Sequence, residues 1–110
     1  MSGIYRLTFM LPPTVLAPPG RHQPCLHGCV LMVDRGGLVS IEGPSREQVF
    51  EQARRFFRIH AKGLPAMTIG ATLTGTGRMP YRDSWSIVVG AEVSFTPAAV
   101  VDIGEPGAAA

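Results

Sequence analysis

Residues 45–63 carry every sequence mark of a complete amphipathic helix, and this segment constrains the fold most. Ser45 suits the N-cap position, and Gln48 three residues later completes a capping box. Gly63 suits the position that ends a helix, and Pro65 prevents its continuation. The segment therefore predicts one helix with a face that must be buried against another element.

The two faces of this helix differ sharply when its residues are placed at about 100° per residue. The apolar arc holds Val49, Phe50, Ala53, Phe56, Phe57 and His60, and the polar arc holds Glu47, Gln48, Glu51, Arg54, Arg55, Arg58 and Lys62. The acidic residues come early and the basic residues late, which complements the helix dipole and predicts a Glu51–Arg55 pair. A solvated face explains this pattern without a ligand, although the arginines could also contact nucleic-acid phosphates.

Alternation of apolar and polar residues predicts strands on both sides of the helix. The predicted strands are residues 4–11, 29–33, 38–42, 67–74 and 84–95. Residues 12–24 contain five prolines and are expected to form a long loop. The resulting order β-β-β-α-β-β predicts an α+β fold, with an antiparallel sheet of about five strands and one helix packed on one face. The other face would be rich in Thr, Ser and Gly, including Gly70 and Gly90.

Length and composition indicate one domain over residues 1–103, with residues 104–110 as a disordered tail. The hydrophobic fraction of 45% and charged fraction of 16% are typical of a globular protein. No stretch approaches the ~20 apolar residues that cross a membrane, and no leader is evident, so we expect a cytoplasmic protein without membrane association. Nine of the ten basic residues are arginine, which we interpret as the composition of a GC-rich bacterial or phage genome.

Two cysteines and two histidines lie within eight residues, at His22, Cys25, His27 and Cys29. These are zinc ligands by type, but their spacing argues against one metal. In a strand, Cys25 and Cys29 would lie about 13 Å apart, whereas ligand atoms of one zinc lie about 4 Å apart. A structural zinc would therefore need a loop here, so it remains an alternative, and we expect neither a metal nor another cofactor.

The segment between the last two predicted strands, residues 75–83, is a second candidate. Its Arg78, Tyr81 and Arg82 could grip a phosphate or stack on a base, and binding groups concentrate on loops held by a scaffold. The segment lacks the strand–GxxxxGK–helix context of a P-loop, so nucleotide hydrolysis is not indicated. Arg78, Tyr81 and Arg82 are the predicted binding residues, with an ordinary solvated hairpin loop as the alternative.

Catalytic patterns are missing from the sequence, because His60, Glu42 and Glu92 have no nucleophile or second carboxylate at a meaningful spacing. The hypothesis that remains is a small non-enzymatic protein that acts by protein–protein interaction. An accessory or inhibitor protein of a phage or mobile element is one version, and a homodimer is another option. The alternatives are a nucleic-acid-binding module, which ranks second, and a protein with a zinc at the Cys/His cluster.

Overall fold

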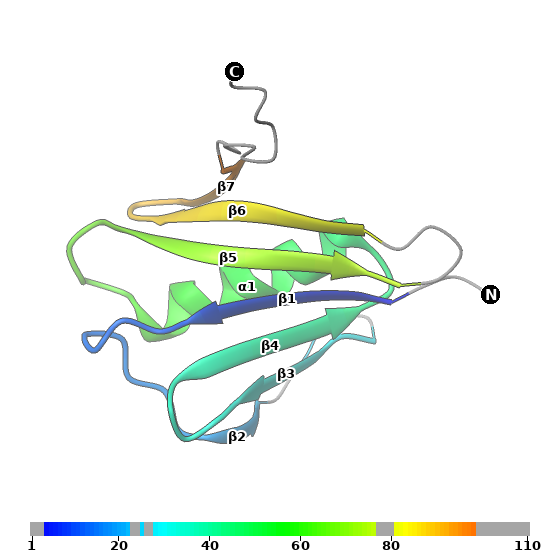
Figure 1. The fold of residues 1–110 in the computed structure, drawn as a ribbon. Coiled ribbons are helices and arrows are strands. Elements are labelled where there is room, and N and C mark those ends of the chain that lie inside the picture. The colour runs from blue at the N-terminus through cyan, green and yellow to red at the C-terminus, as the bar shows by residue number, and fades with distance from the viewer. Residues whose placement is uncertain (1–3, 23–24, 26–27, 77–80, 99–110) are drawn as a thin grey trace.

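The computed structural model describes residues 4–22, 25, 28–76 and 81–98 of the chain. Within these residues, a seven-stranded antiparallel sheet packs against a single helix (Figure 1). The elements are β1 (Tyr5–Met10), β2 (Gly20–His22), β3 (Val30–Val33), β4 (Leu38–Gly43), α1 (Arg46–His60), β5 (Met67–Gly75), β6 (Tyr81–Val89) and β7 (Val93–Pro97). The predicted α+β class is confirmed, but the sheet has seven strands instead of about five.

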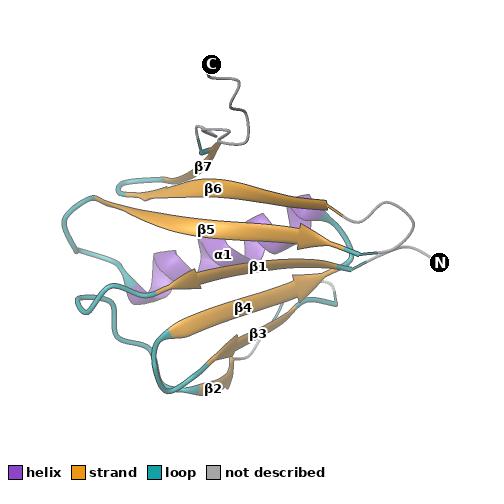
Figure 2. Ribbon diagram, in the orientation of Figure 1, coloured by secondary structure: helices purple, strands orange, loops and turns teal. Residues whose placement is uncertain are grey.

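The strand order is β2-β3-β4-β1-β5-β6-β7. Because β1 is antiparallel to both β4 and β5, these two strands run parallel to each other. The helix α1 connects them, so β4, α1 and β5 form a split β-α-β unit with β1 inserted between the two parallel strands. In Figure 2 the helix lies behind β5 and β1, and the face of the sheet toward the viewer carries no helix.

The predicted helix is confirmed at both ends. The Ser45 hydroxyl accepts the Gln48 N–H at 3.2 Å, and Gly63 has a φ of +82°, the left-handed conformation that favours glycine after a helix. The ion pairing differs from the prediction, because Glu51 binds Arg54 and Arg58 at 3.0 Å each instead of Arg55. Both partners lie within one or two turns of Glu51 on the same side of the helix.

The hydrophobic core lies between α1 and the face of the sheet that is turned toward this helix. The largest fully buried side chains are Phe57, Leu7, Leu31, Ile41, Leu73, Ile87, Val39 and Val49. Phe57 is the largest of these, and its ring lies 5.2 Å from that of Phe9 and 5.4 Å from that of Phe56. The aromatic residues predicted for the apolar arc therefore join the helix to the middle of the sheet.

Two strand predictions were wrong. Residues 12–24 were expected to be loop throughout, but Gly20–His22 forms the edge strand β2 on β3. Residues 84–95 were expected to be one strand, but the chain turns at residues 90–92 and returns as β7. The turn contains three residues, so odd-numbered side chains face the helix both before and after it. The alternation therefore runs through the turn without a break. Gly90, which was expected on the outer face of the sheet, lies in this turn instead.

The predicted loop at residues 75–83 is also too long. Gly75 and Tyr81 are paired across β5 and β6, so Tyr81 and Arg82 belong to a strand. The predicted tail at residues 104–110 lies outside the described residues.

No helix among the described residues is long and apolar enough to cross a membrane.

Candidate binding surface

The side of the sheet opposite α1, which we call the open face, is not covered by any helix among the described residues (Figure 1). Strand geometry decides which residues reach it, because alternate side chains point to opposite sides. The buried members of β1 and β4, such as Leu7 and Ile41, face the helix. Their neighbours Arg6, Thr8, Ser40 and Glu42 therefore face outward.

A row of hydroxyl groups crosses the centre of the open face. The strand registers place Ser40 opposite Thr8, Thr8 opposite Thr72, and Thr72 opposite Ser84. Short hydroxyl side chains on four adjacent strands leave this part of the sheet flat and uncharged. Such a surface can approach another flat surface closely.

The next row of the open face is charged. The registers place Glu42 opposite Arg6, Arg6 opposite Thr74, and Thr74 opposite Arg82. Arg6 Nε donates to the Glu42 carboxylate at 2.7 Å, so these two opposite charges are paired across β1 and β4. The pair is partly exposed and adds specificity to the surface more than stability.

Three exposed apolar side chains, which we call the methionine patch, gather at the other side of the hydroxyl row. Met10 lies directly opposite Leu38, and Met32 lies opposite Ser40, two residues from Leu38 on the same side of β4. Their exposed fractions are 54% for Met10, 44% for Met32 and 37% for Leu38. Adjacent apolar groups exposed on a sheet are costly to hydrate, and methionine adapts its shape to different partners.

The edges of the sheet are poorly suited to binding a partner by strand pairing. The Ala98 N–H donates to the Ser84 carbonyl at 2.9 Å, and this register directs the backbone groups of Val93, Phe95 and Pro97 outward. Pro97 has no N–H, and Arg54 Nε donates to the Val93 carbonyl at 3.3 Å. At the other edge β2 has only three residues. Both edges are thus blunted against pairing with a further strand.

Aromatic side chains face the helix wherever the structure describes them on a strand. Phe9 packs on Phe57, and Trp85 and Phe95 both contact Phe50, with the Phe50 and Phe95 rings stacked at 4.4 Å. Among the described side chains the open face therefore presents no ring on which a nucleic-acid base could stack.

The three predicted binding residues are only partly placed. Arg78 lies outside the described residues, and Tyr81 opens β6 opposite Gly75, its side chain also outside the described part. Arg82 is exposed in β6 opposite Thr74, at the end of the charged row. The structure thus assigns Arg82 to the open face, and a binding site made of all three residues stays a prediction.

The arginines of α1 mostly hold the fold together. Arg54 pairs with Glu51, reaches the Val93 carbonyl and lies 5.0 Å from the centre of the Phe95 ring. Arg46 lies 5.8 Å from the centre of the Trp85 ring. These contacts fasten β6 and β7 to the helix by cation–π and hydrogen-bond interactions. Arg46 and Arg54 therefore have structural roles within the fold.

Of the Cys/His cluster, the structure describes His22, Cys25 and Cys29. The Cys25 thiol donates to the His22 carbonyl at 3.0 Å, whereas Cys29 is buried against the core. A Cβ at Gly43 would lie 2.6 Å from Cys29 Sγ, so glycine is required there. Burial, and secondly the nearby Cys25, raises the pKa of the Cys29 thiol, which makes it a poor thiolate. No group of three His, Cys, Asp or Glu residues could hold a metal among those described, and His27 is outside them.

Two histidines meet where β2 packs on the end of α1. The ring centres of His22 and His60 lie 5.4 Å apart, and His22 Nε2 is 2.7 Å from the Pro18 carbonyl oxygen. Burial first, and then the charge on His22, lower the pKa of His60, while a hydrogen bond to the Leu16 backbone opposes this effect. Arg55 lines the same cavity of about 240 Å³, which no acidic side chain lines.

Acidification is expected to destabilise the protein through His60. A lowered pKa in the folded state means that the unfolded chain binds the proton more readily, so stability is full above about pH 6.5 and falls as the pH drops below it. We expect urea unfolding of wild type to show this loss between about pH 8 and about pH 5. His60→Gln keeps a donor for the Leu16 carbonyl and should have a shallower pH slope. An equal slope in the two proteins would rule out the effect.

Comparison with protein-family models, with curated proteins and with solved structures finds no match to this chain.

The methionine patch escaped prediction from the sequence. Alternation does place Met10 on the same side of its strand as Arg6 and Thr8. It does not show that Leu38 and Met32, more than twenty residues away, lie beside Met10. Only the register of β1, β4 and β3 brings these three side chains together.

Proposed function

We propose that this protein is a non-enzymatic binding protein that recognises another protein through the open face. The methionine patch is the observation that carries the proposal, because three exposed apolar side chains lie on three neighbouring strands of an uncovered sheet face. Exposed apolar patches of this kind mark sites of protein contact. Interfaces are also enriched in methionine relative to the rest of a protein surface.

The size of the open face is adequate for such a role. Seven strands spaced about 4.8 Å apart span about 29 Å, and six residues along β1 span about 20 Å. The resulting flat area of about 600 Å² approaches the ~800 Å² that each partner buries in an interface of standard size. The apolar patch, the hydroxyl row and the charged row give this area a chemically varied pattern that can select one partner.

Two observations favour the face over other parts of the molecule. The edges of the sheet are blunted by Pro97, by Arg54 and by the shortness of β2, which disfavours recognition by strand addition. The arginines of α1 that contact Glu51, Trp85 and Phe95 are engaged within the fold, which disfavours the nucleic-acid alternative.

The proposal can be tested by affinity capture with the full chain from its native host, followed by washing at rising salt. A discrete protein that stays bound at high salt is expected, because burial of apolar surface resists screening. Nucleic acid that is released steeply as salt rises would favour the alternative and contradict this proposal. Light scattering on the purified chain identifies the case in which the partner is a second copy of itself.

A further inference from the structure

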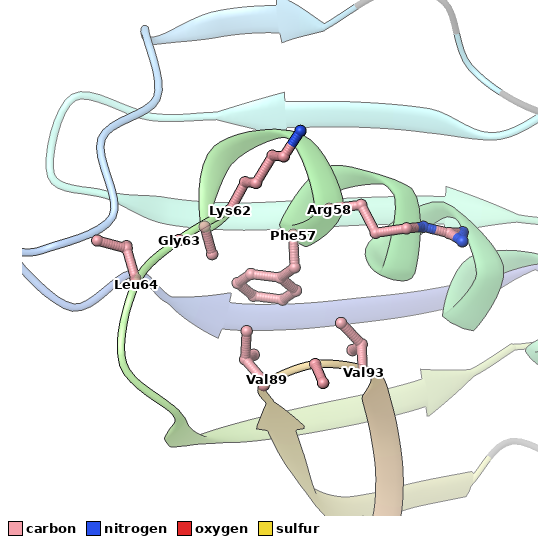
Figure 3. A pocket seen from close by; sticks show the side chains of 10 residues that line it. Phe57, Arg58, Lys62, Gly63, Leu64, Val89 and Val93 are labelled. Carbon is pink, nitrogen blue, oxygen red and sulfur yellow. The ribbon is translucent and has the colours of Figure 1, made fainter.

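The helix side of the molecule contains a second, independent concavity of about 580 Å³. It lies between the C-terminal end of α1 and the turn that joins β6 to β7 (Figure 3). The helix ends at His60 and the chain leaves it through Gly63, and residues on both sides of the β6–β7 turn face this end of the helix. The two segments leave a groove between them.

The inner wall of the groove is apolar. It is formed by Phe57, Ala61, Leu64, Val89 and Val93. In Figure 3 the Phe57 ring projects from the helix toward Val89 and Val93, which belong to the neighbouring strands β6 and β7. The volume lies within the range of about 300–1,000 Å³ that is typical of small-molecule sites.

The charged groups that line the groove are both positive. Arg58 and Lys62 are exposed, and their nitrogens extend away from the apolar wall (Figure 3). Arg58 forms an ion pair with Glu51, whereas Lys62 has no ion pair among the described residues. No acidic residue lines the groove, so these cations outweigh the partial negative charge of the helix C-terminus.

We propose that this groove binds a small amphipathic carboxylate, with the apolar chain against Phe57 and the two valines and the carboxylate near Lys62. Such a molecule matches both halves of the site, since an apolar wall removes its chain from water and an exposed cation meets its charged head. The groove lies on the helix side of the sheet, so this ligand site is separate from the methionine patch. The two proposals can therefore fail independently.

Octanoate is a suitable probe, with octylamine as the comparator of equal chain length and opposite charge. Titration near neutral pH, followed by amide chemical shifts, is expected to give an octanoate Kd of about 1 mM with shifts at residues of the groove. Octylamine should bind at least about fivefold more weakly. Equal affinity for the two probes, shifts confined to other residues, or a Kd for octanoate above about 10 mM would each overturn the proposal.

Substitutions separate the charge from the apolar wall. Lys62→Glu is expected to weaken octanoate binding by at least about fivefold, and Val93→Phe should weaken it by filling the groove while the charge remains. Arg35→Glu is the matched control, because Arg35 is an exposed cation on the β3–β4 turn and should leave binding unchanged. An equal loss in Lys62→Glu and Arg35→Glu would show a general charge effect and contradict a site at the groove.

Discussion

Phe57→Ala is expected to lower the free energy of unfolding by about 3–5 kcal/mol. Phe57 is 1% exposed and packs on Phe9 and Phe56, so its removal leaves a cavity at the junction of helix and sheet. The loss is a large share of the ~5–15 kcal/mol that stabilises a typical domain. Urea denaturation followed by circular dichroism measures it, with an unchanged m-value as the sign that the unfolded states are comparable.

Ile59→Ala is the control for this stability prediction. Ile59 lies in the same helix but is 67% exposed, so its truncation should change stability by less than about 0.5 kcal/mol. A loss below about 1 kcal/mol for Phe57→Ala would contradict the packing of α1 on the sheet through this ring.

The double substitution Met10→Lys/Leu38→Glu is expected to weaken binding of the captured protein partner by at least about 100-fold. Two clustered apolar contacts at the centre of an interface each contribute roughly 1–2 kcal/mol or more, and the new charges would have to be buried on binding. Met10 and Leu38 are directly opposite, so the introduced charges attract each other across β1 and β4 and the net charge stays at +2. Isothermal titration calorimetry measures the affinity, and thermal unfolding verifies that the variant is folded.

The matched control for the patch is Leu16→Glu/Ile59→Lys. Leu16 and Ile59 are 80% and 67% exposed, more than either patch residue, and neither belongs to a strand of the open face. If exposed apolar surface alone caused adhesion, this control would reduce binding more than the patch variant does. Unchanged affinity in the control together with the large loss in the patch variant is the expected result, and the reverse order would refute the assignment of the surface.

Patterns within short segments of the sequence were enough to predict the helix and four of the strands. The helix was predictable because its cap at Ser45, the glycine that follows its end at Gly63 and its apolar arc are all encoded within one continuous segment. The strands β1, β3, β4 and β5 were predictable to within a residue or two at each end, because one side of each is buried and alternation records it. The α+β class followed from these elements together.

The errors came from two kinds of feature. One depends on pairing with residues far away in the sequence, and the other is a turn that leaves the alternation of side chains unbroken. The strand β2 holds only three residues next to two prolines, and its pairing with β3 is what makes it a strand. Val89 and Val93, on the two sides of the turn at residues 90–92, both face the helix. The alternation of inward and outward side chains therefore shows no break at this turn. This missed turn also concealed why Arg54 is half-buried, since its contacts Val93 and Phe95 lie in the unrecognised strand β7.

The candidate site was less accessible to prediction than the fold. Arg78, Tyr81, Arg82 and the Cys/His cluster were candidate sites because their side chains can bind phosphates, bases or a metal. The methionine patch consists of ordinary apolar residues, which carry no such chemical signal. Its significance comes from exposure and adjacency, and both depend on the register of β1 with β4 and of β3 with β4. Sequence spacing carries no information about such adjacency between strands.

Photo-crosslinking in the native host tests the central claim most directly. A photoreactive amino acid replaces Thr8 at the centre of the open face in one variant and Glu47 on the exposed side of α1 in another. The proposal predicts one discrete protein adduct from position 8 and none from position 47. Adducts from position 47 alone, or the same adducts from both positions, would contradict recognition through the open face.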